Sequence, residues 1–503
     1  MATRVAAIPP SAPTRRVQTP PCALVVFGAG GDLSRRKLLP ALYNLAVGAT
    51  LPDRFALLGV ARRGLTNEAF REEMHAAVSE FSRRRLDPEL WRRFAEGVDY
   101  VSGDFEDGAS FERVSTRLQQ LDHRFGLEGN RLFYLATPPT EFGTILRGLK
   151  RAGLIHPPGA GPWSRVILEK PFGRDLESAR ALNRLAAEVL DESQIFRIDH
   201  YLGKETVQNI LVLRFANSIF EPLWNRKYVD YVEICALETV GVGTRGKFYD
   251  QTGVLRDIVQ NHLLEVLALT AMEPPTTGGA DDIRSEKLKV LNALRDPWSD
   301  TIRRDVVLGQ YRGYREEPGV APDSMVPTYA ALRVFVDNWR WQGVPFYLRA
   351  GKKLKKRATE VSVHLQPIPL SLFGRPDVCE FVKPNVLTLR IQPDEGIQLE
   401  FASKVPGDDF MVGAVTMDMK YTEAFGGEPP EAYERLLLDA MRGDATLFSR
   451  RDWVETSWGW IDPIVRHFEE HAAGPFPNYE PGSWGPAHCD EWMRGEHRTW
   501  REP

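Results

Sequence analysis

The fold of this chain is decided by the stretch Ala23-Leu24-Val25-Val26-Phe27-Gly28-Ala29-Gly30-Gly31-Asp32-Leu33 near its beginning. The first five of these residues form a short apolar run that predicts a buried parallel strand. The glycines predict a turn through which the backbone can approach a pyrophosphate at the start of the next helix. Leu33 replaces the third glycine of the usual G-x-G-x-x-G fingerprint, so an ordinary tight turn is the alternative. Pro40 predicts a kink or break in the helix that follows.

Two arginines follow the second predicted strand, which covers residues 55–60. Proteins that bind NAD usually carry an acidic residue here for the ribose hydroxyls, yet no acid occurs between Arg54 and Glu68. A guanidinium from Arg62 would instead suit the extra 2′-phosphate of NADP. The pattern therefore favours NADP, with a solvated basic turn at Arg62 and Arg63 as the alternative.

Strands continue to alternate with helices up to about residue 198. Three more apolar runs predict strands at residues 98–101, 131–136 and 165–169. Lys170 directly follows the third run and is restrained by the next proline, and Asp175 can cap a helix that continues through Leu190. This alternation predicts a doubly wound, Rossmann-like α/β domain over residues 22–198, which binds ligands at the carboxyl ends of its strands.

The strands predicted in the second half of the chain have a different pattern. Apolar and polar residues alternate at residues 231–238, 359–365 and 386–392. Period-two alternation predicts a mainly antiparallel sheet with one covered face. We therefore expect a second, larger α+β domain over residues 199–503.

Residues 197–204, Arg-Ile-Asp-His-Tyr-Leu-Gly-Lys, place five ionisable side chains within eight residues. Because a helix is predicted over residues 205–213, Lys204 lies at or just before a helix N-terminus, where an anion is favoured. Asp199 is a hydrogen-bond acceptor among side chains that donate hydrogen bonds, and a carboxylate in such a place commonly orients a histidine. A surface turn with a satisfied ion pair is the alternative.

His262 lies in a predicted helix over residues 254–266, on the same largely apolar face as Ile258 and Val259. A buried core histidine is the simpler interpretation, although an inward-facing histidine near a carboxylate is also how a general base is built. Asp257 would lie about 140° around an α-helix from His262, at ~100° per residue. Asp199 is therefore the better candidate to orient His262.

Two further motifs carry charge or possible metal ligands. The basic run at residues 349–357 predicts a solvated face, or a loop that closes on a phosphorylated small molecule. His467, Glu470 and His471 fit the H-x-x-E-H spacing of a family of zinc proteases. Gly474 and the proline after it end that helix, and no third ligand is evident, so an ordinary amphipathic helix is favoured and no metal is expected.

The overall composition excludes several classes of protein. With 503 residues the chain is too long for one ordinary core, so two domains are expected. Its 64 basic and 68 acidic residues give a net charge of −4, which provides no general field for nucleic acid. No apolar run approaches the ~18 residues that span a bilayer.

The cysteines and the first residues bear on the compartment. Cys22, Cys235, Cys379 and Cys489 lie far apart, without metal-type or redox spacing, which favours a reducing cytoplasm. Residues 1–21 contain five prolines, three arginines and no acid, which predicts a disordered tail, with a transit peptide as the alternative.

Five blocks of the chain resemble the glucose-6-phosphate dehydrogenase family. They are residues 28–38, 169–173, 197–204, 256–264 and 349–352, and they occur in the order of the family. The block at 197–204 is highly specific, whereas the glycine turn alone would not be. The resemblance runs from about residue 22 to beyond residue 400 and implies a dehydrogenase that oxidises glucose 6-phosphate with NADP to 6-phosphogluconolactone, the first step of the oxidative pentose phosphate pathway.

The resemblance also implies roles for individual residues. His262 would take the proton from the C1 hydroxyl while hydride leaves C1, Asp199 would orient His262, and Lys170 would bridge substrate and nicotinamide. The other implied substrate contacts are His200, Tyr201, Lys204, Glu238, Asp257, Lys352 and Arg357. The implied cofactor contacts are Gly28, Ala29, Gly30, Gly31, Asp32, Leu33, Ser34, Arg35, Lys37, Arg62, Tyr134 and Lys170.

The family further implies a homodimer or homotetramer formed through the large sheet. A catalytically silent protein that binds NADP or a sugar phosphate on the same fold is the main alternative, since fold does not fix function. A zinc hydrolase built on the H-x-x-E-H motif is the second alternative.

Overall fold

The computed structural model describes residues 19–159, 161–297, 299–370, 383–407, 412–426, 429–471 and 474–503. The predicted disordered tail, apart from its last residues, and Cys379 lie outside these ranges. None of the helices in the described ranges is long and apolar enough to cross a membrane.

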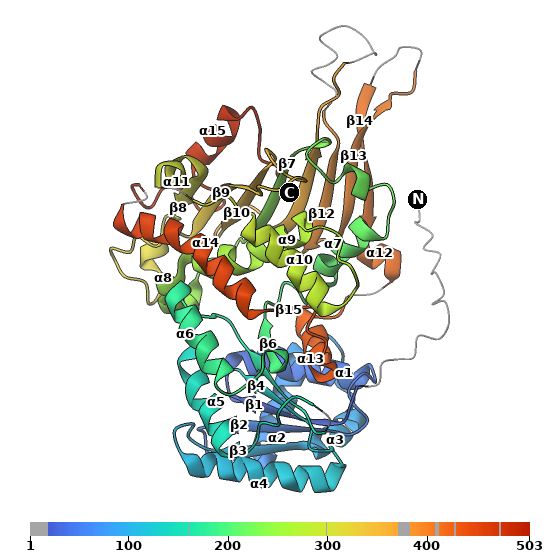
Figure 1. The fold of residues 1–503 in the computed structure, drawn as a ribbon, viewed down its shortest axis with the longest axis vertical. Coiled ribbons are helices and arrows are strands. Elements are labelled where there is room, and N and C mark those ends of the chain that lie inside the picture. The colour runs from blue at the N-terminus through green and yellow to red at the C-terminus, as the bar shows by residue number, and fades with distance from the viewer. Residues whose placement is uncertain are drawn as a thin grey trace.

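The N-terminal half is built on a seven-stranded sheet (Figure 1). Its strands are β1 Cys22–Phe27, β2 Phe55–Ala61, β3 Val98–Ser102, β4 Arg131–Leu135, β5 Ser164–Leu168, β6 Ile195–Ile198 and β15 Phe448–Ser449. They lie in the order β15-β6-β5-β4-β1-β2-β3, and all neighbours are parallel except β15 and β6. The six parallel strands have the order of a dinucleotide-binding sheet, so the predicted Rossmann-like fold is confirmed.

Helices cover both faces of this sheet. They are α1 Leu39–Val47, α2 Asn67–Phe81, α3 Pro88–Glu96, α4 Gly108–Phe125, α5 Phe142–Arg151 and α6 Leu176–Ala187, with the short turns η2 Pro139–Glu141 and η3 Glu192–Gln194. Alternate residues of β1 enter different cores: Leu24 and Val26 join the core that includes α1 and α2, and Val25 and Phe27 join the core of α4 and α5. This double burial explains the uninterrupted apolar run of the sequence.

The helix after the glycine turn is irregular before Pro40, but it continues through Pro40 without the predicted break. After α-helical residues Asp32 and Leu33 it is a π-helix, η1 Ser34–Leu38, and it becomes α-helical again at α1. Pro40 has no N–H to donate to the preceding turn, and the change of helix type occurs just before it. The Asp175 cap of α6 is also confirmed, since its side chain accepts a hydrogen bond from Ser178 N at 2.8 Å, but α6 ends at Ala187 and not at Leu190.

An eight-stranded sheet forms the second half, in the order β14-β13-β12-β11-β7-β10-β9-β8. Its strands are β7 Val229–Leu237, β8 Val306–Gly309, β9 Tyr329–Phe335, β10 Pro345–Gly351, β11 Ala358–Leu365, β12 Val386–Gln392, β13 Gly396–Lys404 and β14 Val412–Lys420. All neighbours are antiparallel except β7 and β10. The prediction of a mainly antiparallel sheet is confirmed.

The prediction of one covered face is wrong at the centre of this sheet. Alternate residues of β7 pack into two different cores, with Val232 and Ile234 in one and Cys235 and Leu237 in the other. The second face is covered by the C-terminal segment that contains α15 Ala487–Gly495 and Tyr479. Chain distant in sequence therefore buries a face that the local pattern assigned to solvent.

Helices of the second half cover the first face of the sheet and form the contact with the N-terminal half (Figure 1). The helices of the second half are α7 Glu205–Phe215, α8 Gly246–Val254, η6 Leu255–Leu263, α9 Leu264–Ala271, α10 Ala280–Asn292, α11 Ser299–Asp305, α12 Tyr421–Phe425, α13 Ala432–Arg442 and α14 Arg451–Glu470, with turns η4 Glu221–Leu223, η5 Gly243–Arg245 and η7 Tyr314–Glu316. Among them, α8 and η7 contribute Tyr249 and Tyr314 to the core of the second face.

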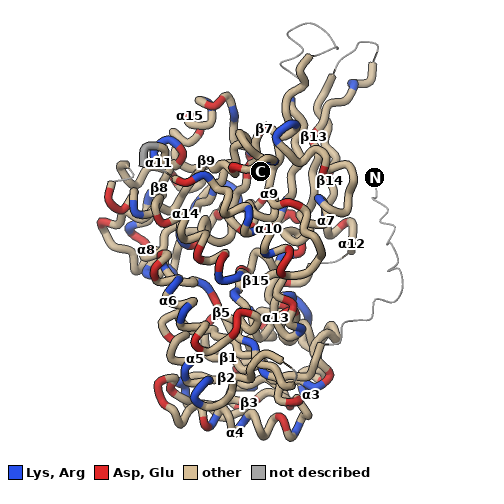
Figure 2. The backbone as a smooth tube through the Cα atoms, viewed as in Figure 1, with Lys and Arg blue, Asp and Glu red and all other residues tan. Residues whose placement is uncertain are grey.

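One segment crosses the predicted boundary at residue 198. Helix α13 packs against α1, and β15 adds an antiparallel strand to the first sheet beside β6. The predicted second domain, residues 199–503, therefore contributes a strand to the first sheet. Basic and acidic residues are interspersed along both halves (Figure 2).

Candidate active site

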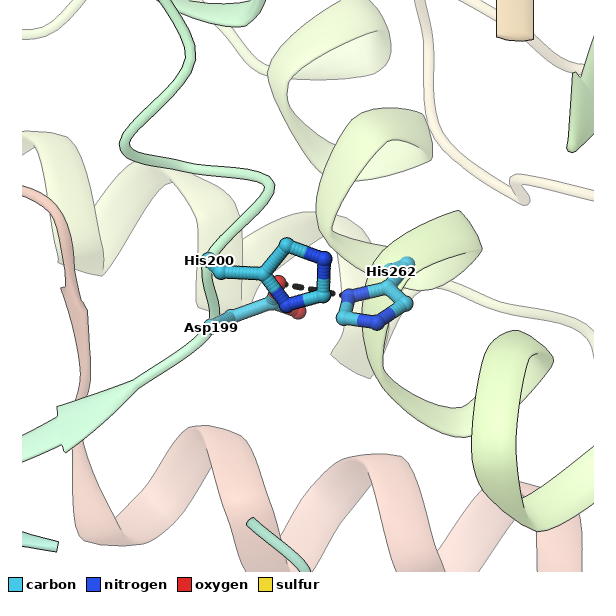
Figure 3. Close-up of side chains that lie close together, drawn as sticks. All are labelled: Asp199, His200 and His262. Atoms are coloured by element: carbon cyan, nitrogen blue, oxygen red, sulfur yellow. Dashed lines mark hydrogen bonds and ion pairs between the residues drawn. The ribbon is translucent and has the colours of Figure 1, made fainter. Parts of the chain in front are cut away.

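The centre of the site is a buried pair formed by His262 and Asp199 (Figure 3). His262 Nδ1 donates to Asp199 Oδ1 at 2.6 Å, and the side chains are 2% and 4% exposed. Burial alone would raise the pKa of Asp199, but His262, His200 and Lys170 outweigh it and hold that pKa below its usual range. The carboxylate therefore stays charged and fixes the histidine tautomer, which leaves Nε2 to accept a proton.

Lys170 reaches the other nitrogen of the same ring. Its Nζ lies 2.9 Å from His262 Nε2 and donates to Asp257 O at 3.1 Å and to Asp257 Oδ1 at 3.3 Å. Burial, only partly offset by Asp199, lowers the pKa of His262, with a further contribution from Lys170. A neutral imidazole whose Nε2 carries no proton is the state that a general base requires.

The helix that carries His262 is a π-helix, and this changes its geometry. Sequence reasoning placed Asp257 far around an α-helix from His262, but η6 forms i→i+5 hydrogen bonds over this segment. Asp257 and His262 therefore lie close enough for Lys170 Nζ to contact both. Asp199 remains the orienting partner, as predicted, because it holds Nδ1 directly.

Two aromatic side chains from the loop after β6 enclose the imidazole. The Tyr201 ring stacks on His262 with centroids 4.1 Å apart and an interplanar angle of 15°, and the His200 ring lies 4.6 Å away at 77°. Tyr201 N also donates to Asp199 Oδ1 at 2.9 Å. Burial and the neighbouring His262, Lys170 and Lys204 charges lower the pKa of His200. The loop that follows β6 thus supplies the carboxylate and both rings.

Lys204 occupies the N-cap of α7, as the sequence predicts. Its Nζ lies 5.2 Å from the Tyr201 ring centre and contacts Gln392 Oε1. Burial lowers the pKa of Lys204 to about 8, and the nearby Arg357 and Lys37 charges contribute to that shift. A concentration of positive charge at a helix N-terminus is suited to a phosphate.

Lys352 and Glu238 form an ion pair, and the Lys352 charge also acts on Asp257. Burial opposes the charge of Asp257, but Lys170, Arg245 and Lys352 lower its pKa to about 2. These contacts join the substrate residues implied by resemblance into one continuous cluster, with Arg357 at its exposed edge beside Lys204.

The glycine turn lies at the carboxyl end of β1. Gly28 has φ +84°, and a Cβ at this position would lie 2.5 Å from Ala136 O, so only glycine fits without rearrangement. Gly31 N donates to Gly28 O at 2.9 Å, and Ser34 Oγ donates to the same oxygen at 3.1 Å. A Cβ on Gly30 would meet nothing closer than 3.9 Å, so that residue leaves the backbone accessible from the open side of the turn.

Other predicted cofactor residues are distributed around this turn. Arg62 is 58% exposed and pairs with Glu141 at 3.1 Å, and Lys37 pairs with Glu431 at 2.9 Å. Asp32 is paired with Arg36 at 2.9 Å. Tyr134 is fully buried, and its hydroxyl donates to Glu169 Oε1 at 2.5 Å, so the structure does not bring it to the surface of the turn.

The residues around the turn fit a dinucleotide. Thr137 Oγ1 is buried without a hydrogen-bond partner, and Thr137 Cγ2 would lie 3.2 Å from a Cβ on Gly28. An unpaired hydroxyl beside a glycine turn and a helix start provides a donor for a phosphate or ribose oxygen. Sequence reasoning marked the loop after β4 as a ligand edge but did not select Thr137.

Three further site residues were not selected from the sequence. Gln392 contacts Lys204, Arg245 lies 4.0 Å from Asp257 Oδ1, and the Tyr249 ring lies 5.1 Å from Lys352 Nζ. Gln392 ends a predicted strand just before a proline, which is a weak signal for a site residue. Nothing in the local sequence of the other two distinguishes them from ordinary polar residues.

Among the described residues, His467, Glu470 and His471 do not form a group that could hold a metal ion. His467 and His471 stack with centroids 4.8 Å apart, and α14 ends at Glu470, four residues before Gly474. Within the described ranges, Asp199, His200 and His262 alone are close enough to share a metal ion. Because His262 Nδ1 is already hydrogen-bonded to Asp199, we interpret these three residues as the Asp199–His262 dyad with the His200 ring beside it.

Comparisons with known proteins agree over nearly the whole chain. The sequence model described as "Glucose-6-phosphate dehydrogenase, NAD binding domain" matches residues 25–209, and that described as the C-terminal domain matches residues 211–501. "Glucose-6-phosphate 1-dehydrogenase" of Chlamydia pneumoniae is 46% identical over 495 residues, with 96% of each chain covered.

Solved structures give the same result. An X-ray structure of glucose-6-phosphate 1-dehydrogenase from Mycobacterium avium is 38% identical with a TM-score of 0.82, and covers 96% of this chain and 99% of its own. A structure described as glucose-6-phosphate dehydrogenase in complex with its substrate is 33% identical with a TM-score of 0.87 and the same coverage.

Proposed function

The chain belongs to the glucose-6-phosphate dehydrogenase family, and from that premise we propose how its residues divide the reaction. The reaction is oxidation of glucose 6-phosphate at C1 to 6-phosphogluconolactone, the first step of the oxidative pentose phosphate pathway. NADP, when bound, supplies the hydride acceptor. The observation that carries the assignment of roles is the placement of His262 between Asp199 at Nδ1 and Lys170 at Nε2.

His262 acts as the general base at the C1 hydroxyl. Its Nε2 takes the hydroxyl proton, and Asp199 stabilises the imidazolium that results. Lys170 loses its contact with Nε2 when the substrate hydroxyl arrives and donates instead to substrate oxygen. Asp257 and Glu238 accept hydrogen bonds from the remaining sugar hydroxyls.

Lys204, His200, Tyr201, Arg357 and Lys352 bind the substrate, chiefly around its phosphate. The support is the half-buried Lys204 at the N-cap of α7, with the Arg357 charge acting on it. The turn from Gly28 to Arg35 holds the pyrophosphate of NADP, and Arg62 holds its 2′-phosphate.

Reduction of the nicotinamide with glucose 6-phosphate tests the activity, with NADP and NAD compared side by side. Rapid reduction of NADP is the expected result. A chain that bound both molecules without reduction would be the catalytically silent alternative. The buried dyad with a lysine at its free nitrogen supports the active protein, because a binding protein needs no proton acceptor at this place.

The pH dependence of substrate binding follows from Lys204. Because the pKa of Lys204 is lowered to about 8 from its ordinary value, the free enzyme loses this positive charge as pH rises through about 8. We expect KM for glucose 6-phosphate to rise above that pH, while KM for free glucose does not. Initial rates with both sugars from pH 6 to 10 measure the effect, and a rise that is equal for both sugars would contradict it.

Replacing Arg62 with Ala is expected to raise KM for NADP roughly 10–100-fold and to leave KM for NAD nearly unchanged, because a charged hydrogen bond to the 2′-phosphate is lost. The pair of Arg62 with Glu141 is largely exposed and contributes little to stability. Kinetics with both cofactors measure the change.

Arg63 provides the matched control for Arg62. It is held by Glu73 through contacts of 2.6 Å and 3.1 Å, so Arg63→Ala should leave the preference for NADP in place. Equal losses with NADP and NAD in Arg62→Ala would contradict the assignment, and a larger effect in Arg63→Ala would transfer the role to Arg63.

The oligomer is a homodimer or homotetramer formed through the large sheet, in the cytoplasm. Its edge strand β14 exposes Met417 at 62% and Val415 at 39%, a surface that a second copy would cover. The described cysteines Cys22, Cys235 and Cys489 are free and buried, which suits a reducing compartment. Sedimentation equilibrium distinguishes monomer, dimer and tetramer.

A further inference from the structure

A second buried ion pair involves the helical segment that carries His262. Glu265 stands three residues after His262 on the same continuous helical segment, and Lys287 comes from α10. Lys287 Nζ lies 2.6 Å from Glu265 Oε2, and the two side chains are 2% and 0% exposed. Ser449 of β15 donates to Glu265 Oε1 at 2.7 Å, and Lys287 Nζ lies 5.0 Å from the Trp453 ring centre.

Stability does not account for this pair. The free energy needed to remove two charges from water can equal or exceed the free energy of their attraction. Apolar residues of similar volume therefore often replace such a pair without loss of stability. The surroundings of Glu265 and Lys287 are a dense apolar core that includes Val266, Val290 and Trp453. A fully buried pair at this place therefore requires another explanation.

The pair adjoins the dyad. Burial raises the pKa of Glu265, Lys287 lowers it, and the charge of Asp199 raises it further, so the two carboxylates are electrostatically coupled. Asp199 Oδ2 is buried without a hydrogen-bond partner. Asp199 lines a cavity of about 20 Å³ that Ser449 and Trp453 also line. Ser449 and Trp453 therefore contact the ion pair and share this cavity with Asp199.

We propose that Glu265 and Lys287 are positioning residues for the general base: Glu265 neutralises the buried ammonium, so that Asp199 is directed only to His262. Without Glu265, the ammonium of Lys287 would attract the free oxygen of Asp199 and disfavour the imidazolium. Without Lys287, the unpaired carboxylate of Glu265 would favour the imidazolium form of His262. This inference rests on the proposed role of His262 as the base.

Other charged or titratable groups also lie beside His262 and are unchanged in the experiment. They are Asp199, His200 and Tyr201 from the loop after β6, Lys170 from the end of β5, and Asp257 from η6. Glu265 and Lys287 do not touch the imidazole, so they act through Asp199.

The test measures the protonation midpoint of His262 in the full-length protein by NMR of ¹³C-labelled histidine, together with the acid limb of kcat/KM against pH. The chain has 10 histidines, and His262→Asn identifies the resonance. Glu265→Gln should move the midpoint down by about one pH unit, and Lys287→Met should move it up, as expected for nearby charges. The double variant Glu265→Gln/Lys287→Met should return it close to the wild-type value.

Asp305→Asn is the control for a purely structural ion pair. Asp305 pairs with Arg333 at 2.5 Å beside β8 and β9, and the two side chains are 17% and 7% exposed. Replacing Asp305 should lower Tm without moving the His262 midpoint. Unchanged midpoints in both single variants, or shifts of the opposite sign, would overturn the proposal, whatever the change in Tm. If the NMR midpoint shifts while the acid limb of kcat/KM stays fixed, the positioning role stands and the general-base assignment fails. If one single variant does not fold, the other and the double variant still decide.

Discussion

Replacing His262 with Asn is expected to lower kcat by ~10²–10⁴, the usual contribution of a positioned base, and to leave the affinity for glucose 6-phosphate nearly unchanged. Asparagine keeps a polar group beside Asp199 but cannot accept the C1 proton at the position of Nε2. The two quantities are measured by steady-state kinetics with NADP and by calorimetric titration of the sugar phosphate.

The chain contains a matched control for this substitution. His364 is also a histidine paired with a carboxylate, 12% exposed and 3.0 Å from Glu233 Oε1, and Tyr231 stacks on it at 4.0 Å. His364→Asn removes the same kind of packing and ion pair from the second sheet, so it should change Tm but not kcat. Near-normal turnover in His262→Asn, or an equal loss in His364→Asn, would end the general-base assignment.

Much of the first sheet could be predicted because its signals are local. A strand buried on both faces has to be apolar throughout, and a glycine turn before a helix needs specific residue types at specific places. The cap at Asp175 and the N-cap position of Lys204 depend on the same short-range chemistry. These features follow from fewer than ten consecutive residues each.

Features that depend on distant chain could not be predicted in this way. Strand β15 has two residues, too few for a periodic pattern, and it exists because β6 leaves an edge to pair with. The second face of β7 is buried by a segment more than 200 positions later, around Tyr479. The contact of Lys170 with His262 joins the end of β5 to a helix of the other half.

The π-helix limited the prediction at the site itself. Counting at ~100° per residue assumes an α-helix, and η6 carries Asp257 and His262 in a wider turn. Resemblance supplied both residues, whereas periodicity alone would have separated them. Local widening of a helix at a functional site is common. However, the sequence of η6 contains no proline or glycine that would indicate a π-helix.

Replacing Lys204 with Ala is expected to reduce kcat/KM for glucose 6-phosphate roughly 100-fold, the size of a lost buried interaction with a charged group. The same variant should scarcely change the weak reaction with free glucose, which has no phosphate to bind. Lys204 is suited to this role because its ammonium lies at the N-cap of α7, where the backbone N–H groups add to the attraction for an anion.

The comparison of the two sugars distinguishes binding from architecture. Binding energy at the phosphate positions C1 against His262, so its loss lowers the rate at a distant atom only when a phosphate is present. Lys204 also contacts Gln392 and Tyr201, and a purely structural role would therefore lower both activities together with Tm. A proportional loss with both sugars and a lower melting temperature would contradict the phosphate site.

Lys356→Ala is the matched control for charge. Lys356 is exposed in the same basic run as Arg357 and donates to Pro503 O at 2.9 Å, away from the dyad. If general attraction of an anion were sufficient, Lys356→Ala and Lys204→Ala would weaken the reaction with glucose 6-phosphate alike, and added salt would remove the difference from wild type. Because Lys204 is half-buried at a helix start and Lys356 is exposed, we expect the effect of Lys204 to persist at high salt and the effect of Lys356 to be small throughout.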